Sequence, residues 1–351
     1  MNPFYVNEMI MKNLRFLLIP FSLLYSFITL IRNFFFDIGI FASKKYRLSS
    51  IGVGNLSMGG TGKSILVDYL ILNFKIKYNL ATLSRGYGRS TKGFLIAEKK
   101  SLAFEVGDEP FQFLNNHPEI KVTVCENRRK GVEKIQKKLP KINLIIFDDL
   151  MQHRWVKSDV LIVTTSFRKP FFKDYVFPFG KLRENRSGIK RADIVLVTST
   201  PKNISDDEKN RFLNNFRIFY SKRVFFTTLK YSSYILNFNE KISTEVLATQ
   251  SFLLVTGIAD TTNFVEYLKL NEYSFEHLKF SDHHNYSTHD CELINRRGKG
   301  KIILTTEKDF GRLAQKLNSS RLYYITVSLN FLDEKDSQVF NALINKKLFS
   351  K

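Results

Sequence analysis

The glycine-rich stretch GNLSMGGTGKS, residues 54–64, constrains the fold of this chain more than any other segment. An apolar run precedes it at 49–55, and a segment with helical spacing of apolar residues follows at 64–74. Glycines in such a turn let backbone N–H groups point inward around an anion, since no Cβ opposes the required backbone angles. The order strand, glycine-rich turn, helix therefore predicts an α/β domain that opens with a phosphate-binding loop.

The residues of this loop have distinct expected roles. Lys63 can reach the β- and γ-phosphates of a nucleotide, and the hydroxyl of Ser64 can bind Mg²⁺. Ser57 stands where the pattern G-x-x-x-x-G-K-[ST] has its first glycine, which changes the entry to the loop and leaves its cradle intact. The candidates for nucleotide binding are Ser57, Met58, Gly59, Gly60, Thr61, Gly62, Lys63 and Ser64.

Short apolar segments separated by helical patterns predict the rest of the fold. Such a sequence is typical of a parallel sheet that is covered by helices on both faces. We expect an α/β protein in which a P-loop NTPase-type three-layer domain is joined by a β-ribbon to a smaller α/β domain. Strand-like runs lie in 78–88, 121–127, 142–149, 159–166, 192–200, 224–239, 251–260, 301–309 and 321–331.

The expected domain organisation has four parts. A membrane anchor occupies 1–42, the P-loop kinase domain 43–223, a β-ribbon linker 224–245 and the smaller α/β domain 246–351.

Two adjacent carboxylates end the apolar run INLIIFDD at 142–149. A phosphate loop needs a metal partner from a neighbouring strand, and Asp148 or Asp149 would hold Mg²⁺ directly or through water. The alternative is a helix N-cap after a strand, a position that also favours aspartate. The polar run Gln152-His153-Arg154 that follows is more than a cap requires, which favours the functional interpretation.

The charge balance restricts the class of partner. Lysine and arginine exceed aspartate and glutamate by 21, so the chain suits nucleic acid, an anionic membrane face or a phosphorylated substrate, unless the excess only forms a solvated surface. We find no nucleic-acid-binding motif, and the charge is spread along the chain. Two cysteines give no disulfide framework and no zinc pattern, so a reducing compartment fits best.

The N-terminal region contains an apolar segment, FLLIPFSLLYSFITLI at 16–31. As a helix it would rise about 24 Å, short of the ~30 Å hydrocarbon core of a membrane. A cleaved signal peptide is disfavoured because no small-residue cleavage site follows. A spanning helix and a helix lying in the interface, anchored by Lys12, Arg15 and Arg32, both stay open, and either attaches the chain to a membrane.

Eight short motifs in order resemble the tetraacyldisaccharide 4'-kinase family, the lipid A 4'-kinases. Each motif is weak alone, but their order through almost the whole chain is strong evidence. In that family a serine or threonine is usual at the position of Ser57. The motifs are VGNLSMGGTGKS (53–64), LSRGYG (83–88), GDEPF (107–111), DDLMQH (148–153), GKLRE (180–184), KRADIVLVT (190–198), SDHHNYS (281–287) and TEKD (306–309).

The resemblance implies a specific reaction. Members of the family transfer the γ-phosphate of ATP, with Mg²⁺, to the 4'-hydroxyl of a lipid A disaccharide 1-phosphate. They act on the cytoplasmic face of the bacterial inner membrane, where anionic lipids are the expected contact. The family's GDEP aspartate acts as base, assisted by the first histidine of its DH motif, which implies Asp108 and His283 here. Because these residues fall in different predicted domains, we expect the pair to form when the domains close.

Further residues in the motifs are candidates for the same site. Arg183 would stabilise the transferred phosphate and Glu184 would assist metal binding. Arg85, Gln152 and His153 are candidates for binding the acceptor. Structural salt bridges are the alternative for Arg183 and Arg85.

The TEKD motif and the histidines leave further alternatives. Lys308 and Asp309 are candidate nucleotide contacts. A surface position is the alternative for His283 and for His284, and a zinc site is rejected because no third and fourth ligand stand nearby. The rival function is a membrane-associated P-loop NTPase switch without a lipid acceptor. We expect neither a nucleic-acid partner nor an obligate protein partner.

Overall fold

A computed structural model describes residues 16–317 and 319–349. The chain forms two compact units that alternate along the sequence. The first unit contains Met1–Lys63, Asp149–Thr228 and Phe331–Lys351, and the second contains Ser64–Asp148 and Leu229–Asn330. The domain boundaries expected from the sequence used consecutive ranges, and they stay a prediction.

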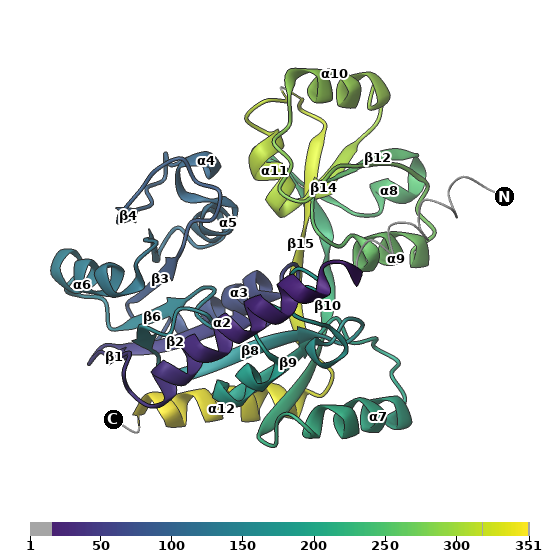
Figure 1. Cartoon of the computed structure of the whole chain (residues 1–351). Coiled ribbons are helices and arrows are strands. Elements are labelled where there is room, and N and C mark those ends of the chain that lie inside the picture. The colour runs from purple at the N-terminus through teal and green to yellow at the C-terminus, as the bar shows by residue number, and fades with distance from the viewer. Residues whose placement is uncertain (1–15, 318, 350–351) are drawn as a thin grey trace. The chain divides into compact units, whose positions relative to one another are not determined.

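Parallel strands form the centre of the first unit (Figure 1). β2 pairs with β8, β8 with β9, and β9 with the start of β10, all in parallel. Residues of β2, β8 and β9 are almost all buried, as expected for strands covered on both faces. The strands are β1 (Lys44–Lys45), β2 (Ser49–Asn55), β7 (Val156–Lys157), β8 (Val160–Ser166), β9 (Ile194–Thr198) and β10 (Arg223–Leu236), which continues into the second unit.

Helices and short 3₁₀ turns complete the first unit. The capping box of α7 uses Ser205, whose hydroxyl accepts a bond from the backbone N–H of Glu208. The elements are α2 (Ile19–Asp37), the 3₁₀ turns η1 (Phe171–Lys173) and η2 (Arg186–Arg191), α7 (Asp206–Arg217) and α12 (Glu334–Phe349).

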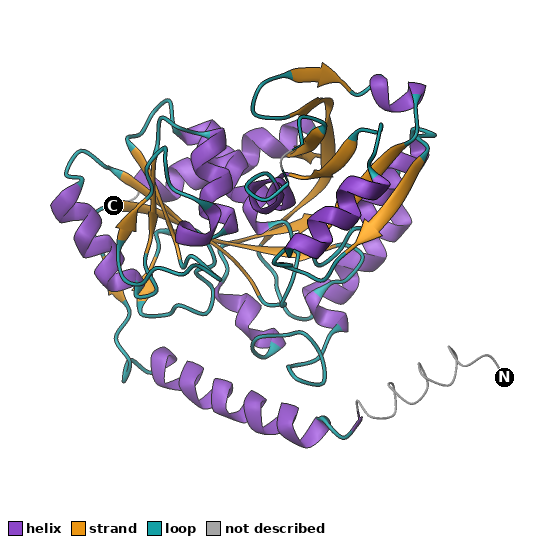
Figure 2. Cartoon of the chain, turned by 90° about the horizontal axis from the view of Figure 1, so that it is seen from above, coloured by secondary structure: helices purple, strands orange, loops and turns teal. Residues whose placement is uncertain are grey.

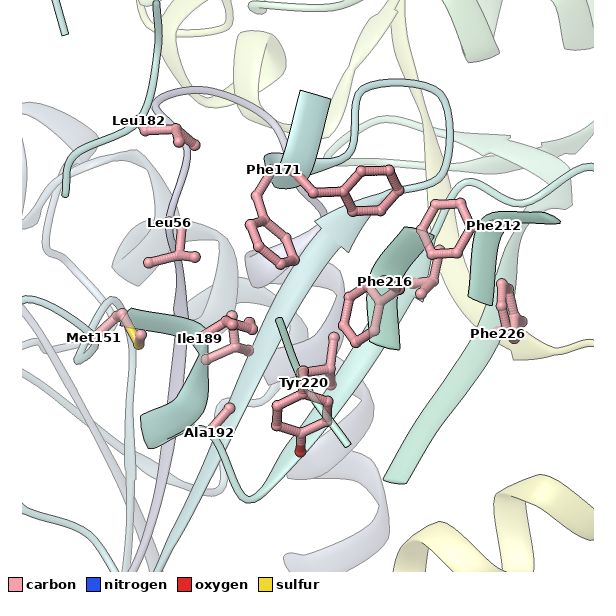
Figure 3. Close-up of a cluster of buried hydrophobic side chains, with 14 residues drawn as sticks. Leu56, Met151, Phe171, Leu182, Ile189, Ala192, Phe212, Phe216, Tyr220 and Phe226 are labelled. Atoms are coloured by element: carbon pink, nitrogen blue, oxygen red, sulfur yellow. The ribbon is translucent and has the colours of Figure 1, made fainter. Parts of the chain in front are cut away.

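An aromatic core supports the phosphate-loop end of the first unit (Figure 3). Leu56, at the start of the loop, and Met151 lie at one side of this cluster, and Phe171, Phe212 and Phe216 fill the other. Burying a phenylalanine side chain contributes about 2 kcal/mol. The loop therefore starts from a rigid, well-packed base.

The second unit contains two groups of strands. In the first group, β6 and β5 pair with β3 in parallel, and the short β4 pairs with β5 in the antiparallel direction. Its elements are α3 (Lys63–Phe74), β3 (Leu80–Ser84), β4 (Leu95–Ile96), α4 (Ala103–Val106), α5 (Asp108–Asn116), β5 (Lys121–Val124), α6 (Arg128–Lys138) and β6 (Leu144–Phe147).

The second group is a further parallel sheet in the order β13-β12-β14-β15. β10 runs beside β15 and pairs with β11 in the antiparallel direction, which forms the ribbon that the sequence predicted near 224–239. The elements are β11 (Lys241–Ser243), α8 (Val246–Thr249), β12 (Phe252–Thr256), α9 (Thr262–Leu270), β13 (Phe275–Lys279), α10 (Thr288–Arg297), β14 (Ile303–Thr306), α11 (Glu307–Leu313) and β15 (Leu322–Phe331).

The predicted fold class is confirmed, since strands that alternate with helices form parallel sheets in both units. The apolar N-terminal segment is also helical as predicted: α2 begins at Ile19 with Pro20 in its first turn, where the missing N–H costs nothing (Figure 2). By length and composition, α2 alone among the described helices could cross a membrane. Lys12 and Arg15, two predicted anchor residues, lie outside the described residues.

Candidate functional site

The phosphate loop is shaped by backbone geometry and by a short chain of hydrogen bonds. Gly59 and Gly62 adopt positive φ angles of 96° and 80°, where a Cβ would be strained. The amide of Asn55 donates to the Ser57 carbonyl and to the Thr61 hydroxyl, each at 2.7 Å. These bonds close the turn, and the helix that follows begins at Lys63.

The position of Ser57 explains why the first glycine of the pattern is dispensable. Ser57 has no positive φ, and it forms an isolated antiparallel bridge with Leu182. The next residue, Met58, donates its N–H to the carbonyl of Lys181 at 2.7 Å. The entry to the loop is therefore fixed by backbone pairing with the GKLRE segment, which a serine allows.

Three predicted site residues meet directly beside the loop. Arg183 donates from Nη1 to both carboxylate oxygens of Asp149, at 2.8 and 2.7 Å. Nζ of Lys63 lies 3.6 Å from Oδ1 of Asp149. The carboxylate thus lies between two cations, which is the charge arrangement expected where phosphate or a metal ion binds.

Asp149 also has an unusual backbone. Its φ is 54°, in the left-handed region that residues other than glycine seldom adopt. Such strain persists where the surrounding structure holds the residue for a purpose. This conformation is more than a simple helix cap requires, and it favours the functional interpretation of the carboxylate pair.

Gln152 and Glu184 lie in the same cluster. Nη1 of Arg183 donates to Oε1 of Gln152 at 3.1 Å, and the Gln152 amide donates to the Asn55 carbonyl and to Glu184. Glu184 is 2% exposed, and its oxygens also accept bonds from Arg191 and Asn33. So many bonds favour a positioning role for Glu184, while metal binding by this residue stays a prediction.

The remaining predicted residues near the carboxylate pair have fewer described contacts. Asp148 is buried, and its backbone carbonyl accepts a bond from Arg128 at 3.0 Å. Ser64 is half-buried in the first turn of α3. His153 donates its backbone N–H to the Leu150 carbonyl. The metal roles of Asp148 and Ser64 and the acceptor role of His153 stay predictions.

Asp108 and His283 form a pair within the second unit. Nδ1 of His283 lies 2.9 Å from Oδ2 of Asp108, although the residues are 175 positions apart in the sequence. Asp108 is the first residue of α5, where the helix dipole favours a negative charge. His283 has a positive φ of 53°, and the hydrogen bond to Asp108 raises its pKa above the ordinary value.

This pair corrects one expectation from the sequence. We expected Asp108 and His283 to lie in separate domains and to meet on closure. Both lie in one compact unit, because the segments 64–148 and 229–330 pack together, and their hydrogen bond is already formed.

Backbone packing brings two motifs of the second unit together. A Cβ on Gly107 would lie 3.1 Å from Gly86 Cα, so the GDEPF and LSRGYG segments touch through glycine. Gly107 has a φ of 98°, which reinforces the need for glycine at this point. Arg85 is exposed on the rim of an open hollow of about 440 Å³ that Tyr87 and Lys92 also line.

Arg312, which no sequence motif singled out, completes the surroundings of Asp108. Arg312 lies with Nε 3.7 Å from Oδ2 of Asp108, and it donates to the backbone carbonyls of Gly257 and His284. It thereby joins the carboxylate to the loop that carries His283. The only signal in the sequence was the i,i+3 spacing of Asp309 and Arg312 after TEKD.

The TEKD motif forms an ion pair and hydrogen bonds within the second unit. Lys308 forms an ion pair with Glu109 at 2.7 Å; burial tends to raise the pKa of Glu109, but the lysine outweighs it and holds that pKa at about 2. Asp309 is fully buried, and its carboxylate accepts bonds from Gly257, Tyr286, Thr306 and Arg312. A nucleotide contact by Lys308 or Asp309 stays a prediction, and the observed role of both residues is structural.

The residues present fit a nucleotide phosphate and Mg²⁺. A Cβ on Gly60 would meet no atom within 4 Å, so open space lies on this side of the turn. One hydroxyl and two carboxylates, from Ser64, Asp148 and Asp149, are the oxygen ligands that Mg²⁺ prefers.

Comparisons with known proteins agree with these features. The model of the family described as Tetraacyldisaccharide-1-P 4'-kinase matches residues 14–348. A tetraacyldisaccharide 4'-kinase of Flavobacterium johnsoniae is 43% identical over 93% of this chain and 96% of its own length. One of Flavobacterium psychrophilum is 41% identical over 94% and 97%.

A solved structure is similar along almost the whole chain. LpxK from Aquifex aeolicus, crystallised in complex with ATP, is 29% identical and gives a TM-score of 0.77 over 96% of this chain and 100% of that one. The motifs, the fold and the matches along nearly the full sequence lead to one assignment: this chain belongs to the tetraacyldisaccharide-1-P 4'-kinase family.

Proposed function

We propose that this chain is a kinase that transfers the γ-phosphate of ATP to the 4'-hydroxyl of a lipid A disaccharide 1-phosphate. The observation that carries the proposal is the family match over residues 14–348. The phosphate loop, with Lys63 and Arg183 on either side of Asp149, supports the nucleotide half of the reaction.

Phosphoryl transfer needs a bound nucleotide in the correct position, cations on the transferred group and a base for the attacking hydroxyl. Lys63 and Arg183 supply positive charge for the phosphate oxygens. Ser64, Asp148 and Asp149 would hold Mg²⁺, which would supply further neutralisation of phosphate charge.

Asp108 takes the proton from the 4'-hydroxyl. The hydrogen bond from His283 orients the carboxylate, and Arg312 lies beside it with Nε 3.7 Å from Oδ2. Arg85, Gln152 and His153 are the proposed acceptor contacts. The proton goes to Asp108, the new bond forms between the sugar oxygen and the γ-phosphorus, and ADP leaves.

We also propose that the chain works at the cytoplasmic face of the bacterial inner membrane. The exposed apolar residues of α2 support attachment, and a net charge of +21 attracts anionic lipids. Flotation with vesicles of phosphatidylethanolamine and phosphatidylglycerol tests this. The wild-type chain should float with the vesicles, whereas the variant with Leu24→Asp and Phe27→Asp should stay in the dense fraction. If the variant floats as well as the wild-type chain, the attachment does not depend on the apolar face of α2.

The activity test uses the purified chain in detergent with γ-labelled ATP, in the presence and absence of lipid A disaccharide 1-phosphate. We expect labelled lipid, and ATP consumption that depends on the acceptor. ATP hydrolysis at the same rate with and without acceptor, and no labelled lipid, would instead support the NTPase switch.

A further inference from the structure

Helix α2 buries polar residues and exposes apolar ones, which is the reverse of the usual arrangement. A helix on a globular protein normally buries its apolar stripe. Here Ser22 and Thr29 are each 7% exposed, whereas Phe21 is 64% and Phe27 61% exposed. Beside the buried Phe36, the side that faces the body of the first unit therefore carries polar residues, and their hydrogen-bonding groups need partners.

Several of those partners lie in or just before the motifs that form the nucleotide site. Ser22 Oγ donates to the carbonyl of Val176 at 2.6 Å, and Tyr25 Oη donates to the carbonyl of Arg183 at 3.1 Å. One helical turn or more further on, Arg32 and Asn33 donate to two more residues of the site. Arg32 Nη2 reaches the Gln152 carbonyl at 2.7 Å, and Asn33 Nδ2 reaches Oε2 of Glu184 at 2.8 Å.

The end of the helix is also fixed. Arg154, which follows the DDLMQH motif, donates to the Asn33 carbonyl at 2.8 Å and to Asp37 at 2.6 Å. Its guanidinium also lies over the ring of Phe36. Contacts at both ends and in the middle of α2 therefore define its register against the site.

The contacts of Tyr25, Arg32 and Asn33 lead to Arg183 through at most two further hydrogen bonds. Glu184 is tied to Gln152, and Gln152 is tied to Arg183 and to Asn55 at the start of the phosphate loop. Arg183 in turn binds Asp149 with both of its carboxylate oxygens. Two routes thus lead from α2 to the guanidinium of Arg183. One runs through the backbone of Arg183, and the other runs through Glu184 and Gln152.

Burial increases the importance of these bonds. Arg32 is half-buried, and its guanidinium points to the Gln152 carbonyl within the cluster. A Cβ on Gly188 would lie 2.8 Å from Oε2 of Glu184, so the opposite side of that carboxylate is closely packed. Glu184 therefore has little room to move, and Asn33 is one of the residues that hold it in place.

We infer that the inward polar stripe of α2, defined as Tyr25, Arg32 and Asn33, positions Arg183 and Gln152 for phosphate transfer. The helix is then a structural part of the nucleotide site in addition to any attachment that it provides. This inference rests on the proposed function, because its effect is on the turnover of that reaction.

The test compares Asn33→Ala and Arg32→Met with Phe34→Ala, a control on the exposed face of the same helix. All are assayed as full chains in detergent, so vesicle attachment plays no part. We expect about a tenfold loss of kcat for each inward variant, little change in the KM for ATP, and wild-type kinetics for Phe34→Ala. Arg32→Lys should recover part of the loss. Tyr25→Phe, which removes a single hydroxyl, should lower kcat about threefold without affecting folding.

A double-variant cycle separates positioning from general support. In an Arg183→Ala background, Asn33→Ala should cause no further loss of kcat, because the group that it positions is gone. Equal additional loss in both backgrounds, or wild-type kcat in the inward variants, would overturn the inference. Failure of the proposed function would look different, since the wild-type chain itself would transfer no phosphate, and the inference would fall with it.

Discussion

The phosphate loop of the first unit and the acid–base pair of the second unit are built in different ways. The loop is one continuous stretch whose shape comes from its own glycines and from bonds between residues a few positions apart. The pair is assembled from Asp108 and His283, with Arg312 beside them, and these residues come from separate parts of the chain. A continuous stretch can be identified from its spacing, whereas an assembled site depends on tertiary packing, so substitutions should affect the two in different ways.

The largest effect is expected at the loop. Lys63→Ala removes the cation that lies beside Asp149, and we expect both a weaker affinity for ATP and a loss of turnover of about 10³-fold. Isothermal titration with ATP and the labelled transfer assay measure the two quantities. Lys77→Ala, an exposed lysine just beyond α3, is the matched control. Unchanged ATP affinity in Lys63→Ala would contradict the assignment of the loop.

Substitutions in the assembled region of the second unit should mainly affect the free energy of unfolding. Lys308→Met leaves the carboxylate of Glu109 largely buried and without its lysine, so we expect a loss of about 2 kcal/mol in the free energy of unfolding. Urea unfolding at neutral pH measures it. Adding Glu109→Gln to the same chain should restore most of the loss, because no unpaired charge is left. A double variant that is no more stable than Lys308→Met would exclude this explanation.

A smaller effect should depend on pH. Burial raises the pKa of Glu307 from 4.5 to about 7, and Gln112 donates to its carboxyl at 2.6 Å where α5 meets α11. The folded state thus binds the proton more tightly than the unfolded state, so the stability of the wild-type chain falls as pH rises from 4.5 through 7 and changes no further above it.

Glu307→Gln removes this carboxyl. The stability of the variant should not decrease over this pH range. Above pH 7 its free energy of unfolding should exceed that of the wild type by on the order of 1 kcal/mol, with no such gain near pH 4.5. Thermal unfolding across the pH range gives the comparison. A constant difference at every pH would exclude titration of Glu307 as the cause.

The smallest expected effect is a change in the pKa of His283, which tests its hydrogen bond with Asp108. Asp108→Asn removes the negative partner of His283, so the pKa of His283 should fall toward or below its ordinary value. Ring-proton NMR of histidine as a function of pH measures the shift. His289, which is exposed at the start of α10, provides an internal reference that should not move.

The contrast between the two regions also explains what the sequence could predict. Apolar runs such as INLIIFDD and ADIVLVTST predicted buried parallel strands, because both faces of such strands need apolar residues. The phosphate loop and the Asp148–Asp149 pair were identified from spacing alone. Asp108 and His283 came only from family resemblance, since nothing local distinguishes an aspartate at a helix start or a histidine in a polar loop.

Some site features had no sequence signal. The sequence did not predict the inward polar stripe of α2, because Tyr25 lies within the uncharged segment 16–31 and Arg32 was interpreted as a membrane anchor. Arg312 was not identified, and Arg154 was noted only as part of the polar run after the carboxylate pair, because each donates to atoms far away along the chain. Predicting such contacts needs the packing of elements, and a pattern along one segment does not contain that information.

The central claim is that the loop binds ATP while Asp108 deprotonates the acceptor, and Asp108→Asn tests it most directly. In one preparation of this variant, the Kd for ATP and the rate of label transfer to lipid A disaccharide 1-phosphate are measured side by side. The account predicts an ATP affinity within about twofold of the wild type and a transfer rate lower by about 10³-fold. Transfer at a near wild-type rate, or an ATP affinity that falls together with transfer, would contradict it.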